Sequence, residues 1–183
     1  MTHQESEPTK FIRDLKDKSS LLVFYDNQSY AKSLGFLYLD MGIKSGHVCL
    51  YLSCETTQDV EAGMASAGID VVSAKANNSL KVHNITNHKK DQITKLIEEF
   101  VKNAKEHSRI ILQHDKFTRA QQQDLLLLEE FIQAMFEKHN ISVLKIYNTE
   151  FLDNAEFMQR IINMHEYTIF APDFGKGIVI KMK

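Results

Sequence analysis

The sequence predicts a doubly wound α/β fold, in which a mostly parallel sheet is covered by helices on both faces. Short apolar runs indicate buried strands, and amphipathic segments with helical spacing alternate with them. The length of 183 residues suits one domain of ordinary size. Strands that alternate with helices imply right-handed crossovers between parallel neighbours. The expected strands are residues 21–25, 48–52, 80–84, 109–113, 142–147 and 167–170.

The amino-terminal segment is polar and contains Pro8. We expect residues 1–10 to be mobile and residues 11–15 to form one amphipathic helical turn on the edge of the domain. The chain therefore divides into a flexible segment with a short helix, residues 1–18, and a single domain, residues 19–183. The sequence shows no Ser/Gly-rich linker or internal repeat that would indicate a second domain.

Two helices are expected in the first half of the domain. Ser29 can cap the first, whose apolar positions continue until Gly42 or Gly46. The second opens at Thr57 and ends near Gly68. Residues 69–72 are expected to follow as an extended edge.

The second half carries the clearest helical pattern. From Asp91, apolar residues recur with the i, i+3, i+4 spacing of a helix that covers a sheet. Thr118 and Gln121 form a capping box for a long helix that ends at Lys138, and another helix is expected over residues 154–164. A glycine-containing turn at residues 172–177 predicts an antiparallel hairpin between residues 167–170 and 178–181.

Composition and charge exclude several classes of protein. The chain has 22 basic and 24 acidic residues, so nucleic acid is not expected as its main partner. No apolar run approaches the roughly 20 residues needed to cross a bilayer, and the polar start lacks the apolar stretch of a signal peptide. We therefore expect a cytoplasmic protein that does not enter a membrane. Its two cysteines, Cys49 and Cys54, are expected to be reduced core residues without a disulfide between them.

The turn after the first strand has no glycine-rich phosphate loop. Such a loop needs glycines so that successive backbone N–H groups can surround a phosphate. Residues 26–33, with the sequence DNQSYAKS, offer no glycine, and Asp26 would repel a triphosphate. Lys32 is interpreted as a solvated helix residue.

The order of the pieces is similar to the RecA-like core of KaiC-type ATPases. The resemblance is carried by FLY at residues 36–38, KSG at 44–46, CLYLSCET at 49–56, AGID at 67–70 and SLKV at 79–82. Two further signatures, FYD at residues 24–26 and LQHDKF at 112–117, resemble the MEDS family of sensory domains. The resemblance covers residues 19–182 and implies a three-layer, RecA-like sheet of the P-loop NTPase type without the Walker A motif. It also implies the sensing of small hydrocarbon derivatives.

The candidate site follows from the rule that open α/β sheets bind ligands outside the carboxyl ends of their strands. This rule selects Tyr25, Asp26, Asn27, Ser53, Glu55, Gln113, His114 and Asp115. In a working RecA-like ATPase, Asp115 would hold magnesium and Glu55 would lie near the base that orients water. The competing interpretation is that Asp115 caps a turn with Thr118 and that Glu55 is solvated. His114, Tyr25 and Gln113 could together form the polar floor of a small ligand pocket.

No cofactor, metal ion or catalytic residue is expected. The eight histidines lack the close pairing typical of zinc sites. The sequence also contains no GxSxG nucleophile elbow and no GxGxxG dinucleotide motif.

Three functions remain open at this point. The first is a non-catalytic sensory or signalling module that binds a small ligand or a protein partner. The second is an atypical ATP-binding protein or ATPase that uses Lys32, Glu55 and Asp115. The third is a scaffold that forms a homodimer, because the leucines at 125–128 surround a helix and cannot all face one core.

Overall fold

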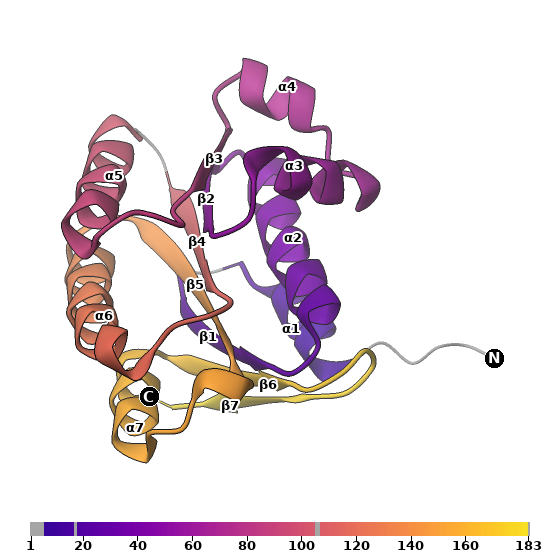
Figure 1. The fold of residues 1–183 in the computed structure, drawn as a ribbon. Coiled ribbons are helices and arrows are strands. Elements are labelled where there is room, and N and C mark those ends of the chain that lie inside the picture. Colours follow the sequence, from indigo (N-terminus) through magenta and orange to yellow (C-terminus); the bar gives the residue numbers. More distant parts are fainter. Residues whose placement is uncertain (1–5, 17, 105–106, 183) are drawn as a thin grey trace.

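The computed structural model describes residues 6–16, 18–104 and 107–182. Within these residues, seven strands form one sheet in the order β3-β2-β4-β5-β1-β6-β7 (Figure 1). The strands are β1 (Ser20–Tyr25), β2 (Val48–Ser53), β3 (Leu80–Asn84), β4 (Ser108–His114), β5 (Ile141–Asn148), β6 (Tyr167–Ala171) and β7 (Ile178–Lys181).

The pairing in this sheet is parallel except at its last edge. The ladders from β3 to β6 are parallel, and β6 pairs with β7 in the antiparallel sense, with Thr168 opposite Ile180. In the turn between them, Gly177 has a φ of 133°, and a Cβ there would lie 2.4 Å from the carbonyl oxygen of Phe170. The predicted mostly parallel sheet and its carboxy-terminal hairpin are therefore confirmed.

Helices cover both faces of the sheet and give three layers (Figure 1). One face carries α1 (Glu7–Asp14), α2 (Gln28–Lys44), α3 (Thr57–Ser66) and α4 (Val71–Ala76). The other face carries α5 (Lys90–Asn103), α6 (Gln122–Lys138) and α7 (Ala155–Met164). Short 3-10 turns, η1 (Arg119–Gln121) and η2 (Thr149–Phe151), precede α6 and follow β5. None of the described helices is long and apolar enough to cross a membrane.

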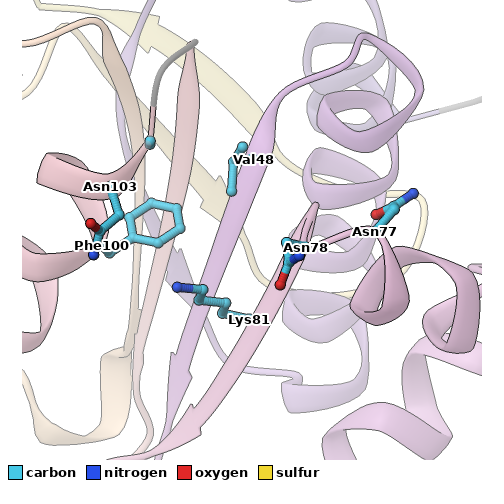
Figure 2. A pocket seen from close by; sticks show the side chains of 7 residues that line it. Val48, Asn77, Asn78, Lys81, Phe100 and Asn103 are labelled. Carbon is cyan, nitrogen blue, oxygen red and sulfur yellow. The ribbon is translucent and has the colours of Figure 1, made fainter.

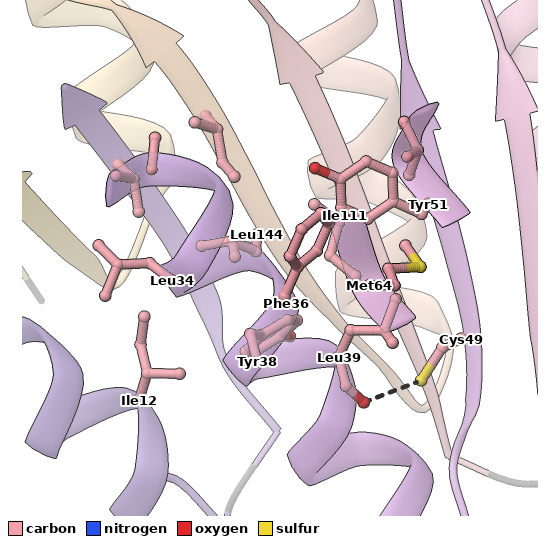
Figure 3. Close-up of a cluster of buried hydrophobic side chains, with 14 of the residues drawn as sticks. Ile12, Leu34, Phe36, Tyr38, Leu39, Cys49, Tyr51, Met64, Ile111 and Leu144 are labelled. Carbon is pink, nitrogen blue, oxygen red and sulfur yellow. Dashed lines mark hydrogen bonds between the residues drawn. The ribbon is translucent and has the colours of Figure 1, made fainter. Parts of the chain in front are cut away.

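The core on the α2 face is shown in Figure 3, where side chains from α1, α2 and α3 meet those of the strands. Cys49 is buried there, with its Sγ 3.8 Å from the carbonyl oxygen of Leu39. Cys54 is exposed, because it follows β2 in a loop, so the expectation that it lies in the core is wrong. Both thiols are free, as expected.

Two helix starts differ from the sequence prediction because an earlier side chain caps each helix. Asn27 replaces Ser29 as the cap of α2, since its Oδ1 accepts the N–H of Tyr30 at 3.1 Å. Ser6 caps α1, so this helix begins at Glu7 and includes residues expected to be mobile. Residues 1–5 of that expected mobile segment lie outside the described part.

Residues 69–72 do not form an extended edge. Asp70 accepts the N–H of Ser73 at 3.0 Å and caps α4, which begins at Val71. The place beside β2 is taken by β3, with Cys49 opposite Leu80. A side-chain cap thus decides the conformation of a segment that the apolar pattern predicted to be extended.

The run of leucines in α6 is divided between core and surface. Leu125, Leu126 and Leu128 are buried, and Leu127 is 39% exposed. The core interpretation therefore accounts for three of the four residues.

Candidate functional site

The carboxyl ends of β1, β2 and β4 meet at one edge of the sheet, as the site prediction requires. Side chains in a strand alternate between the two faces, so neighbours in one strand can serve different surroundings. Gln113 faces α2, whereas His114 faces α6 and α7. The predicted residues therefore divide into two groups.

On the α2 side, a chain of hydrogen bonds joins Tyr51, Gln113, Asp115 and Tyr25. The Tyr51 hydroxyl donates to Gln113 Oε1 at 2.6 Å, and Gln113 Nε2 donates to Asp115 Oδ1 at 2.5 Å. The Tyr25 hydroxyl donates to the same Asp115 oxygen at 2.6 Å. Tyr51 was not among the predicted site residues, although its strand position places it on the same face as Gln113.

Burial fixes the protonation of this chain. It is the main cause that raises the pKa of both Tyr25 and Tyr51 well above the ordinary value, and the nearby carboxylates add to it. Both phenols therefore keep their protons and act as donors, and Asp115 is the acceptor. The expectation that Asp115 pairs with Thr118 is wrong, because Thr118 bonds to Gln121 instead.

The turn between β1 and α2 is filled by its own side chains. Only Asp26 and Asn27 separate the two elements. Asp26 accepts a hydrogen bond from the Thr149 hydroxyl, and Asn27 Nδ2 donates to Asp173 at 3.0 Å. Because Asn27 also caps α2, one of the free N–H groups at the start of this helix, that of Tyr30, is satisfied from within the protein.

Lys32 and Glu55 form an ion pair beside this turn. Their Nζ and Oε2 atoms are 2.5 Å apart, and the side chains are 30% and 22% exposed. The expectation that both residues are simply solvated is therefore wrong. Ser53 supports the same loop, since its Oγ accepts the Glu55 N–H at 3.1 Å.

On the other face, His114 lies over a buried ionic network. Its ring stacks on Tyr147 with centroids 5.1 Å apart, and its Nε2 is 3.5 Å from Lys145 Nζ. Lys145 pairs with Glu129 at 3.0 Å, and the two side chains are 0% and 1% exposed. The Tyr147 hydroxyl donates to the same Glu129 oxygen.

The network extends to the amino end of β1 through His165. Its Nε2 lies 3.3 Å from the second Glu129 oxygen, and its Nδ1 is 2.8 Å from Ser20 Oγ. None of Glu129, Lys145 and His165 was predicted as part of a site. Lys145 gave the one available signal, a charge inside an otherwise apolar strand.

The charges in this network set the ionisation of its members. Burial opposes the charged form of Glu129, but Lys145, His165 and Tyr147 together outweigh it and hold the pKa of that carboxyl well below its usual range. Burial, followed by the charge of Lys145, lowers the pKa of His114 to about 3. His114 is therefore neutral at pH 7.

An open cavity of about 240 Å³ lies beside His114, between the start of α5 and the start of α6. It is lined by Cys54, Ile85, Thr86, His88, Lys89, Lys90, Ile93, His114, Lys116, Phe117, Gln121, Asp124, Leu125 and Leu128. A second cavity, of about 400 Å³, opens at the opposite edge of the sheet around Asn78, Lys81 and Phe100 (Figure 2). Of these two cavities, the first meets the carboxyl ends of the strands, where an open α/β sheet binds ligands.

A metal centre is not evident in this arrangement. Within residues 6–16, 18–104 and 107–182, no cluster of three or more His, Cys, Asp or Glu side chains could hold a metal ion.

Comparison with known proteins agrees with the fold and identifies the family. A KaiC-like protein of the hyperthermophilic archaeon Pyrococcus horikoshii OT3 superposes with a TM-score of 0.67 at 14% identity, over 92% of this chain and 81% of that one. This likeness shows the RecA-like fold. No curated protein matches the sequence. The family model for the methanogen/methylotroph, DcmR sensory domain matches residues 21–166, and the chain therefore belongs to the MEDS family.

Proposed function

We propose that this protein is a non-catalytic sensory module that binds a small ligand or a protein partner at the carboxyl edge of its sheet. Residues 19–183 would act as one domain. Membership of a family of sensory domains supports the sensory role.

The observation that carries the proposal is the filled turn between β1 and α2. In a RecA-like ATPase, a glycine-rich loop at this place would present N–H groups to a phosphate. Here Asn27 caps the helix, and the carboxylates of Asp26 and Asp173 flank the turn. A triphosphate would meet negative charge at the place where it needs hydrogen-bond donors. We therefore interpret the turn as a degenerate P-loop.

The residues that an ATPase would require are engaged elsewhere. Lys32 is neutralised by Glu55, and Asp115 accepts two hydrogen bonds from buried donors. Freeing either group would break a contact within the protein before a nucleotide could gain one.

Isothermal titration with MgATP tests this proposal. We expect no saturable heat from the wild type or from Lys32→Ala. Lys44→Ala is the matched control, because Lys44 lies at the other end of α2 and pairs with Asp40. Tight binding that Lys32→Ala abolishes and Lys44→Ala preserves would overturn the proposal in favour of an ATP-binding protein.

A further inference from the structure

We propose that the cavity between α5 and α6 binds a small organic anion, with its charged end at the lysines and its apolar body on the core. This assignment rests on the sensory function proposed above and names the class of ligand. Five features of the cavity support it: its size, its apolar wall, its lysines, His114 and the start of α5.

The size of the cavity and its apolar wall indicate how large and how apolar the ligand is. Ile85, Ile93, Phe117, Leu125 and Leu128 are buried residues in the lining. The volume of about 240 Å³ is below the roughly 300–1,000 Å³ of pockets for drug-sized ligands. The ligand is therefore small and has an apolar part.

The charges at the cavity favour an anion. Lys89, Lys90 and Lys116 line it, against the single carboxylate of Asp124. Lys90 is held by Asp91 at 3.0 Å, whereas Lys89 and Lys116 have no ion-pair partner among the residues that the structure describes. Two cations are thus available to a bound carboxylate or phosphate.

His114 supplies a buried donor. The side chain is 6% exposed and belongs to the lining. Its Nε2 faces the ammonium of Lys145 at 3.5 Å and must accept there, so the proton of the neutral ring sits on Nδ1. In the described part of the chain, no partner meets that Nδ1–H, and an anionic oxygen would satisfy it.

The start of α5 adds backbone donors to the same wall. Its cap residue, Lys89, has no side-chain oxygen to offer, whereas Asn27 and Thr56 cap α2 and α3. The first turn of this 14-residue helix already carries the Asp91 carboxylate, which pairs with Lys90, so its backbone donors add to the cations and do not form an anion site alone.

The test is a titration followed by amide NMR, with benzoate as the probe and benzyl alcohol as its neutral counterpart. We expect benzoate to shift the signals of residues 88–93 and 114–117, and benzyl alcohol to bind at least about tenfold more weakly. Hexanoate tests a different apolar group with the same carboxylate, and phenyl phosphate tests a different anionic group with the same ring. If none of the three anions shifts these signals at about 10 mM, above a weak dissociation constant of about 1 mM, the proposal is overturned.

Variants assign the effect to the cavity. Lys89→Ala/Lys116→Ala should weaken benzoate by about tenfold, and His114→Phe should weaken it while keeping the ring stack on Tyr147. Lys95→Ala/Lys102→Ala, on exposed positions of α5 outside the lining, is the matched control and should bind as the wild type does. Equal binding by all variants would contradict the site.

Failure of the anion-site proposal can be distinguished from failure of the proposed sensory function. If neither benzoate nor MgATP binds, the proposed class of ligand is wrong and the proposed sensory function still stands. MgATP binding that depends on Lys32 removes the function itself.

Discussion

The two sides of the carboxyl edge handle polar groups in opposite ways. On the α2 side, Tyr25, Gln113 and Asp115 satisfy one another, and Lys32 is matched by Glu55. On the α5/α6 side, cations and a histidine donor border an open cavity. A polar cluster at a strand end is therefore a weak sign of a binding site until its partners are known.

One strand supplies both sides. Gln113 and His114 are neighbours in β4, yet Gln113 accepts from Tyr51 and His114 stacks on Tyr147. The difference is maintained by the partners of each residue, which are Tyr51 and Asp115 for Gln113 and the Lys145–Glu129 pair with Tyr147 for His114. Changes that disturb one side should leave the other intact.

The largest expected effect comes from the buried ion pair. Lys145→Met should cost about 3–5 kcal/mol of unfolding free energy, because it leaves the Glu129 charge buried without its cation. Lys145→Met/Glu129→Leu should recover a large part of that loss. Urea denaturation measures the free energy of unfolding of both variants. If Lys145→Met were as stable as the wild type, the assignment of a buried ion pair would be contradicted.

The pH dependence of stability should report on His114. Its pKa falls from the ordinary value of 6.5 to about 3 on folding, so the unfolded chain binds more protons between those values. Stability is therefore full above about pH 6.5 and decreases by about 1.4 kcal/mol per pH unit below it. His114→Phe should reduce this slope between pH 6 and pH 5, where His107 still contributes because burial lowers its pKa to about 4 as well. Parallel curves for the two proteins would refute the attribution.

Tyr51→Phe should have a smaller effect on the α2 side. Removal of the hydroxyl leaves Gln113 Oε1 buried without its donor, at a cost of about 1–2 kcal/mol. Tyr38→Phe is the matched control, because the Tyr38 hydroxyl is buried without a hydrogen bond in the described structure. Equal losses for the two variants in denaturant melts would show that the Tyr51 bond contributes nothing.

Lys32→Ala should have the smallest effect. Its pair with Glu55 is partly exposed to solvent, and such pairs contribute about 0.2–1 kcal/mol. The same melts at low and high salt measure it. A loss above about 2 kcal/mol would mean that the pair is a structural requirement of the β1–α2 edge.

The sequence predicted the sheet, its carboxy-terminal hairpin and the long helices, because apolar periodicity and turn residues are local signals. It also placed Tyr25, Gln113 and Asp115 at one edge. It missed the contact of Lys145 with Glu129, since nothing near residue 145 indicates which distant acid will be buried beside it. It treated Gln113 and His114 as one floor, although strand alternation separates them.

The most direct test is one amide NMR experiment in which the protein is titrated with MgATP and then with benzoate. We expect the signals of residues 26–32 to stay unchanged throughout and those of residues 88–93 to shift only with benzoate. A saturable MgATP shift confined to residues 26–32 would contradict the account.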